Sequence, residues 1–426
     1  MIDRTPGFST LAVHAGAQPD PTTGARVTPI YQTSSFVFDD VDHAASLFGL
    51  QAFGNIYTRI GNPTCAVLEE RVAALEGGTA ALAVASGHAA QFLVMHTLLK
   101  SGDDFVASNK LYGGSINQFN HSYKSFGWNV QWADGTDPSS FERALTPKTK
   151  AIFIESLANP GGIVTDIAAI AAIARKAGVP LIVDNTLATP YLCRPIEHGA
   201  DIVVHSLTKF LGGHGNSIGG ILVDGGTFDW RGSDKYPFLS EPRPEYQGMI
   251  LGETFGNFAF AIAARVLGLR DLGPALSPFN AFMILTGIET LPLRMEKHCA
   301  NTRAVAEWLK GRPEVSWVSY AGLPEDPSHA LAQKYMPKGA GAVFTFGLRG
   351  GYEAGVALVS KVQLFSHLAN VGDTRSLIIH PASTTHRQLS DAQKTAAGAG
   401  PDVVRLSIGI EDAADLIADL EQALAG

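Results

Sequence analysis

The sequence predicts an α/β protein with a large, mostly parallel β-sheet domain and a smaller C-terminal α+β domain. Three observations support this prediction. Short apolar runs alternate with helical patterns in the middle of the chain, glycine is abundant, and the pattern changes after Pro274. The chain has 426 residues, of which 45 are glycine and only 9% are aromatic. Such a composition suits tight strand-to-helix turns and close helix packing.

Six short apolar or β-branched runs are the predicted strands of the large sheet. Helical patterns lie between them; the one over 167–176 ends at Gly178, with Pro180 just beyond. Right-handed crossovers through such helices place the strands parallel to one another. The predicted strands cover residues 81–85, 105–106, 151–154, 181–183, 202–204 and 220–223.

The chain divides into three expected regions. Residues 1–61 form an arm that must pack on something else, such as a neighbouring subunit, and residues 1–40 show no clear helical period. Residues 62–272 open with a helix that Thr64 can cap, and they contain the predicted large sheet. Residues 273–426 contain the smaller domain. There we expect a long helix over 278–311, strands at 315–318 and 342–346, and a second helical pair that ends at the C-terminus.

Charge and cysteine content exclude several classes of protein. The chain has 32 basic and 40 acidic residues, a net charge of −8, and no run of like charges, so we expect no nucleic-acid partner and no membrane patch. Its 3 cysteines form no disulfide framework, and without CxxC or HExxH motifs we expect no metal. The start MIDRTPGFST lacks an apolar signal core, which favours a soluble, cytoplasmic protein.

Polar residues follow four of the predicted strands. In parallel sheets the carboxyl ends of the strands form the ligand site. Each polar pair alone is more commonly an ordinary strand end, but four together favour a site. The pairs are Ser86-Gly87, Glu155-Ser156, Asp184-Asn185 and His205-Ser206.

Lys209 follows one of these strands among small and hydroxyl residues. Desolvation of its ammonium group would prepare it for Schiff-base chemistry, although this segment alone is equally compatible with a surface lysine. Asp184 is placed to hold a protonated pyridine nitrogen, which makes pyridoxal phosphate an electron sink; the alternative is a simple strand cap. The helix that opens at Ser86-Gly87-His88 has free N–H groups for a phosphate, and the hydroxyls of Ser206 and Thr208 would add to them.

Tyr112 lies in a glycine-flanked turn and is suited to stacking on a flat ring; core packing is the alternative.

Two other motifs are incomplete. Residues 206–209 match the S-x-x-K of penicillin-binding enzymes, but the S-D-N and K-T-G partners are absent. Residues 213–218 resemble a dinucleotide fingerprint, but Ile218 stands where its third glycine belongs.

Together these motifs resemble the pyridoxal-phosphate enzymes of Cys/Met metabolism, which have the fold-type I transferase architecture. The resemblance covers nearly the whole chain in order. Within the family, the chain is most similar to the O-acetylhomoserine sulfhydrylase branch, through residues 14–16, 29–33 and 53–59 and the polar, proline-rich insertion at 225–250. The family motifs are Tyr57-Thr58-Arg59, Gly61-Asn62-Pro63-Thr64, Ser86-Gly87, residues 155–160, Asp184-Asn185-Thr186, residues 206–209, residues 376–383 and residues 404–409.

The resemblance implies a role for each candidate residue. Lys209 would carry the cofactor covalently, Asp184 would pair with its pyridine nitrogen, and Tyr112 would stack on its ring and act as a second acid–base group. Residues 62–272 would be the cofactor-binding domain. Phosphate contacts would come from Ser86, Gly87, His88, Ser206 and Thr208, and from Tyr57 and Arg59 of a neighbouring subunit. The substrate carboxylate would be bound by Arg405, with Asn159 and Ser376 assisting.

The implied reaction is γ-replacement, in which O-acetyl-L-homoserine and sulfide give L-homocysteine and acetate in methionine biosynthesis. Cystathionine γ-synthase, O-succinylhomoserine sulfhydrylase and methionine or cystathionine γ-lyase activities are the alternatives. Gly114 stands where methionine γ-lyases have cysteine, which argues against a lyase. A non-enzymatic scaffold would be expected to lack Lys209, Asp184 or Arg405, and all three are present. The family also implies a homotetramer built as a dimer of dimers.

Overall fold

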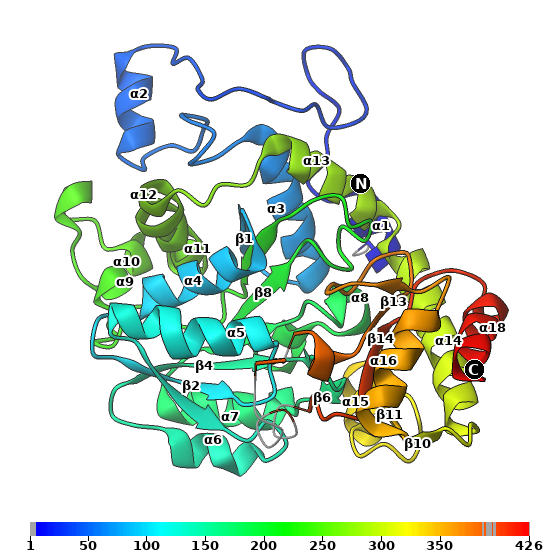
Figure 1. The fold of residues 1–426 in the computed structure, drawn as a ribbon. Helices are drawn as coiled ribbons and strands as arrows, with labels where there is room; N and C mark the ends of the chain where they lie inside the picture. Colours follow the sequence, from blue (N-terminus) through cyan, green and yellow to red (C-terminus); the bar gives the residue numbers. More distant parts are fainter. Residues whose placement is uncertain (1–5, 386, 389–393, 395–397, 426) are drawn as a thin grey trace.

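Two β-sheets form the frame of the molecule (Figure 1). The computed structural model describes residues 6–385, 387–388, 394 and 398–425. A seven-stranded sheet occupies the middle of the chain and a five-stranded sheet its C-terminal part, and β5 (Leu157–Ala158) and β6 (Ile163–Val164) form a separate pair. The predicted α/β class, with a large and a small domain, is confirmed.

The large sheet is mostly parallel. Strands β3, β2, β4, β7 and β8 run in one direction, and only β9 is antiparallel to its neighbours, β8 and β1. All the parallel strands therefore end at the same edge. In spatial order the strands are β1 (Ala80–Val84), β9 (Gly220–Asp224), β8 (Ile202–Ser206), β7 (Leu181–Asp184), β4 (Thr149–Glu155), β2 (Asp104–Ser108) and β3 (Asn129–Ala133).

Both faces of this sheet are buried, which explains its continuous apolar runs. Successive side chains of a strand point to opposite faces. In β4, Ile152 and Ile154 pack in the core that includes Leu68 of α3, whereas Phe153 packs in a second core with Leu93 of α4. Six of the seven strands were predicted. The exception is the edge strand β3, whose sequence NVQWA is partly exposed and has no apolar run.

Helices surround the two sheets. The helices of the N-terminal segment and the large domain are α1 (Phe8–His14), α2 (Val41–Phe48), α3 (Pro63–Glu76), α4 (Gly87–Leu98), α5 (Gly113–Asn117), α6 (Pro138–Ala144), α7 (Ile167–Ala177), α8 (Thr189–Leu192), α9 (Pro237–Ser240), α10 (Leu251–Phe255), α11 (Ala259–Ala263) and α12 (Arg270–Leu272). Those that follow are α13 (Pro278–Glu289), α14 (Leu291–Lys310), α15 (His329–Tyr335), α16 (Gly351–Lys361) and α18 (Ala413–Leu424). Among the described residues, no helix is long and apolar enough to cross a membrane.

Three local predictions need correction. The expected single helix over 278–311 is two helices, α13 and α14, because Pro292 lacks an N–H and fits only in the first turn of a helix. The cap of α3 is Asn62, which accepts the N–H of Thr64, while the Thr64 hydroxyl donates to the Pro29 carbonyl. The N-terminal segment contains two helices, and Ala12 of α1 is buried in the core of its own chain.

The smaller sheet also contains strands that the sequence pattern did not predict. Strands β12, β13 and β14 lie between α16 and α18, where only helices were expected. All neighbouring strands are antiparallel except β12 and β13. In spatial order the strands are β10 (Val315–Ser319), β11 (Val343–Leu348), β14 (Val403–Ser407), β13 (Leu377–Ile379) and β12 (Ser366–His367).

Asp419 of α18 fixes the segment that leads into β12. Its carboxylate accepts the backbone N–H groups of Gln363, Leu364 and Phe365 at 2.8, 2.8 and 3.0 Å. Burial alone would raise the pKa of Asp419, but these three N–H groups and the side-chain amide of Gln422 outweigh it, and the pKa is lowered.

We expect Asp419→Asn to lower the free energy of unfolding by about 2 kcal/mol at pH 7, because an amide cannot satisfy all three donors. The measurement is urea unfolding. The folded-state pKa is depressed, so the stabilisation is complete above the unfolded value of about 3.9 and is lost as the pH falls through the folded value. The difference between the two proteins should therefore shrink in acid. Asp415→Asn, on the exposed side of α18, is the control; equal losses in both variants would contradict the role of Asp419.

Candidate active site

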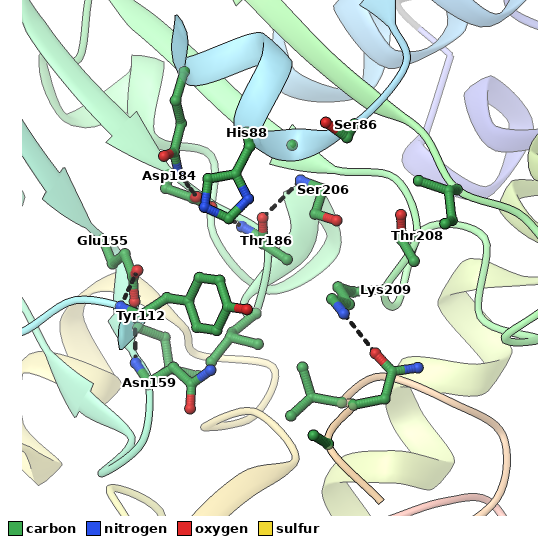
Figure 2. Close-up of a pocket in the computed structure, with 18 of the residues that line it drawn as sticks. Ser86, His88, Tyr112, Glu155, Asn159, Asp184, Thr186, Ser206, Thr208 and Lys209 are labelled. Atoms are coloured by element: carbon green, nitrogen blue, oxygen red, sulfur yellow. Dashed lines mark hydrogen bonds between the residues drawn. The ribbon is translucent and has the colours of Figure 1, made fainter. Parts of the chain in front are cut away.

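A cavity of about 320 Å³ lies at the carboxyl ends of the large-sheet strands (Figure 2). The small domain completes its wall with residues 369–371 and with Arg405 of β14. The polar ends of three neighbouring strands, Glu155, Asp184 and Ser206, all line it. Ten of the thirteen predicted site residues line this cavity: Ser86, Gly87, His88, Tyr112, Asn159, Asp184, Ser206, Thr208, Lys209 and Arg405.

The Lys209 amine projects into the cavity from the turn after β8 (Figure 2). Its Nζ donates to Oδ1 of Asn370, 2.5 Å away in the small domain. Burial lowers the pKa of Lys209, and the nearby charge of Arg405 lowers it further. An amine with a lowered pKa is more readily neutral, which is the form that attacks a carbonyl carbon.

The turn that follows Lys209 is tightly packed. The buried guanidinium of Arg294 donates to the carbonyls of Phe210 at 2.7 Å and Leu211 at 3.2 Å. The backbone of α13 approaches the same turn so closely that a Cβ on Gly287 would lie 2.0 Å from the Gly212 carbonyl oxygen. These contacts hold the lysine against the end of the sheet.

Asp184 is held by two donors. The Thr186 N–H donates to Oδ1 at 3.0 Å, and the side-chain amide of Gln91 donates to Oδ2 at 3.1 Å. The same Gln91 amide donates to the Ser115 hydroxyl at 3.1 Å. A carboxylate fixed in this way has further lone pairs for a cationic donor in the cavity.

The start of α4 offers N–H groups to an anion. Ser86 caps the helix, its hydroxyl accepting the N–H of Ala89 at 3.1 Å. The N–H groups of Gly87 and His88 have no intrahelical partner, because these residues lie in the first turn. Ser206 lies so close that a Cβ on Gly87 would be 2.9 Å from the Ser206 Cβ. Backbone N–H groups, the helix dipole and nearby hydroxyls together suit a phosphate.

Thr208 adds a hydroxyl to the cavity wall, where it accepts the N–H of Gly219 at 3.1 Å.

Tyr112 precedes α5, and its ring is close to that of His88, with centroids 5.9 Å apart. The backbone N–H of Tyr112 donates to Glu155 Oε1 at 2.7 Å. A Cβ on Gly114 would lie only 2.3 Å from the Tyr112 ring, so the tyrosine needs a glycine at this position.

Arg405 reaches the cavity from the small sheet. Its guanidinium donates to Asn159 Oδ1 at 3.1 Å and to the Asn370 carbonyl at 3.2 Å. Burial lowers the pKa of Arg405 to about 10. The group remains a cation at neutral pH and is suited to bind a carboxylate in a bidentate manner.

Three predicted residues lie outside the cavity wall. Tyr57 and Arg59 contact each other, with the guanidinium 5.4 Å from the ring centroid, and Arg59 also donates to the Arg270 carbonyl. Their role in a neighbouring subunit stays a prediction. The structure does not bring Ser376 to the cavity, because its buried hydroxyl bonds to Glu411 at 2.9 Å and accepts the N–H of Gly409.

Four further residues of the cavity wall contact predicted site residues, although no role in the site is predicted for them from the sequence. The sequence identifies Glu155 as a strand end, and Thr186 only as a member of the family motif Asp184-Asn185-Thr186. Gln91 lies one helical turn after Gly87, and this spacing could have placed it on the same face of α4. No sequence motif around Asn370 points to the site, because this residue comes from a loop of the other domain.

This arrangement fits pyridoxal phosphate. Asp184 can hold a protonated pyridine nitrogen, and the start of α4 with the hydroxyls of Ser206 and Thr208 can hold a phosphate. The buried amine of Lys209 can bind the aldehyde.

Comparisons with known proteins agree with this geometry. The family model described as "Cys/Met metabolism PLP-dependent enzyme" matches residues 9–425. The O-acetyl-L-homoserine sulfhydrylase of Leptospira meyeri is 53% identical over 97% of this chain and 96% of its own. O-acetyl-L-homoserine sulfhydrylase 1 of Thermus thermophilus is 54% identical over 98% of this chain and 100% of its own.

A solved structure gives the same result. A Campylobacter jejuni protein, provisionally named an O-acetylhomoserine (thiol)-lyase, is 42% identical and superposes with a TM-score of 0.95, covering 99% of this chain and 100% of that protein. Its structure contains an N'-pyridoxyl-lysine-5'-monophosphate. The chain therefore belongs to the PLP-dependent enzymes of Cys/Met metabolism, and pyridoxal phosphate is its cofactor.

Proposed function

We propose that this enzyme catalyses γ-replacement, converting O-acetyl-L-homoserine and sulfide to L-homocysteine and acetate. The observation that carries the proposal is the placement of the Lys209 amine in one cavity with Asp184 and Arg405. These groups suit a substrate that is an amino acid with a free carboxylate. The acetyl ester and the sulfur nucleophile follow from the sulfhydrylases that share more than half of its residues.

Each residue has a task in this reaction. The cofactor, when bound, supplies an electron sink for the substrate's α-carbon. Arg405, supported by Asn159, binds the α-carboxylate and sets the orientation of the substrate. Asp184 keeps the pyridine nitrogen protonated, and Tyr112 stacks on the ring and provides a second acid–base group.

Lys209 moves the protons. Its amine removes the proton from the α-carbon and then handles a proton at the β-carbon. The bond between the γ-carbon and the ester oxygen breaks and acetate leaves, and sulfide forms the new carbon–sulfur bond at the γ-carbon. Lys209 then returns the protons in reverse order. The phosphate is held by Gly87, His88, Ser206 and Thr208.

The site belongs to an oligomer in this proposal. The N-terminal arm, residues 1–61, exposes Val37, Val41 and Phe53 at 95, 83 and 80%. Apolar side chains exposed to this degree favour burial against another copy of the chain. Tyr57 and Arg59 of that copy would then reach the phosphate. The enzyme would be a homotetramer in the cytoplasm and would act in methionine biosynthesis. Residues 62–272 would bind the cofactor, and residues 273–426 would form the C-terminal domain.

Product analysis tests the reaction itself. With O-acetylhomoserine as substrate, we expect homocysteine and acetate to form only when sulfide is present. Formation of 2-oxobutyrate and ammonia at a comparable rate without sulfide would instead identify a γ-lyase. A preference for O-succinylhomoserine, or for cysteine as the sulfur donor, would identify one of the synthase alternatives.

We expect Lys209→Ala to lower kcat by at least ~10³-fold, because both the covalent attachment and the proton transfers depend on this amine. The measurement is steady-state turnover of the purified variant reconstituted with excess cofactor. Lys110→Ala, a change outside the cavity wall, is the matched control. Turnover retained by Lys209→Ala would refute the mechanism.

Hybrid oligomers test whether the site is shared between subunits. Co-expression of differently tagged Lys209→Ala and Arg59→Ala chains, each inactive alone, should yield hybrids with one intact site in two, because Lys209 and Arg59 come from opposite chains. The mixture should recover roughly a quarter of the wild-type activity. If both residues served the same chain's site, every hybrid site would be defective and no activity would return.

A further inference from the structure

Glu155 connects two parts of the active site. It is the last residue of β4, and its side chain is 4% exposed. The Tyr112 N–H donates to Oε1 at 2.7 Å, and the Asn159 N–H donates to Oε2 at 3.0 Å (Figure 2). Tyr112 lies between β2 and α5 and Asn159 lies between β5 and β6, so one carboxylate holds two separate loops.

This carboxylate is held without a counter-ion. Within the described part of the chain, no lysine, arginine or histidine forms an ion pair with it. Burial raises the pKa of Glu155 well above its usual range, and the charge of Asp184, its partner in the β4–β7 ladder, adds to this effect, while the N–H groups of Tyr112 and Asn159 act in the opposite direction. A buried carboxyl group with no cation costs stability. This loss of stability indicates that Glu155 has a role other than stabilising the fold.

The backbone of Glu155 is itself fixed. Its carbonyl accepts the Thr165 hydroxyl at 2.7 Å, and its strand pairs with β7 in the interior of the sheet. The carboxylate is therefore a rigid reference point to which the two loops are attached. Its two oxygens accept from two different directions, which a glutamine could not do, since one of its two terminal atoms is a donor.

We propose that Glu155 is a positioning residue. Through the backbone of Tyr112 it fixes the ring that stacks on the cofactor, and through the backbone of Asn159 it fixes the amide that supports Arg405 at the substrate carboxylate. The inference rests on the proposed function, because the roles of Tyr112 and Asn159 belong to that proposal. This role requires no proton transfer by Glu155.

Glu155→Gln and Glu155→Ala test the role. An amide keeps one of the two hydrogen bonds, so we expect Gln to be intermediate and Ala to be most affected. For Gln we expect a roughly 10- to 100-fold lower kcat/KM for O-acetylhomoserine, with most of the change in KM, because small misplacements of binding groups have effects of this size. Cofactor affinity, measured by titrating the apoenzyme with pyridoxal phosphate, should fall, and the visible absorbance of the bound cofactor should change.

A role based on charge alone gives a different result. Gln and Ala would then have equal effects, since neither side chain can ionise, and this outcome would overturn the proposal. Glu142→Gln, on the exposed face of α6 where Glu142 pairs with Lys176, is the matched control and should leave all readouts unchanged. Circular dichroism and the thermal midpoint of each apoprotein identify any variant that has not folded.

Double variants test whether Glu155 acts through the two loops. If it acts through the Asn159 amide, Glu155→Gln should raise KM little further in an Asn159→Ala background. If it acts through the Tyr112 ring, it should weaken cofactor binding little further in a Tyr112→Ala background. Fully additive effects in both backgrounds, or unchanged KM and cofactor affinity in the single variant, would refute the inference.

The two proposals can fail separately. If the wild-type enzyme does not convert O-acetylhomoserine with sulfide, the proposed function fails. The cofactor titrations of the Glu155 and Tyr112 variants would still test the positioning role, because they require no substrate.

Discussion

The backbone ladder that joins β4, β7 and β8 is the constraint on which the site depends. These parallel strands are in register, with Glu155 opposite Asp184 and Asp184 opposite Val204 of β8. Their polar ends therefore lie at one edge of the sheet without any contact between the side chains being needed to bring them there. Because both faces of the sheet are buried, a shift of one strand would move its apolar side chains as well, and the core opposes it.

The electrostatics of the site follow from this placement. Lys209 and Arg405 bring two basic groups into a partly dehydrated space, and Glu155 and Asp184 bring two carboxyl groups from neighbouring strands. The two basic groups come from different domains: the lysine follows β8 and the arginine comes from the small sheet. The Lys209 amine and the Arg405 guanidinium therefore lie on opposite sides of the domain interface. An amino-acid substrate can lie between them, with its carboxylate at Arg405.

Site residues whose position follows from one local rule could be predicted from the sequence. Lys209, Asp184 and Ser206 were predicted because polar residues after buried parallel strands converge. Asn370 could not be found in this way, since its place depends on how the two domains pack. Ser376 was assigned from a motif alone, and the structure shows its hydroxyl occupied by Glu411. The break between α13 and α14 was not predicted, although Pro292 indicates it, whereas strand β3 has no such signal, because an edge strand needs no apolar run.

The tight packing behind Lys209 has a consequence for how this site can diverge. Gly287 and Gly212 leave no room for even a methyl group, and Arg294 occupies the carbonyls of the same turn. Random substitution here would damage the lysine's support before it altered which substrates fit. In the opposite wall, residues 369–371, Asn370 accepts the Lys209 amine and Val371 is buried in the core, whereas Ala369 is exposed. Directed evolution of new acyl groups or nucleophiles should therefore begin at Ala369, the exposed residue of that wall.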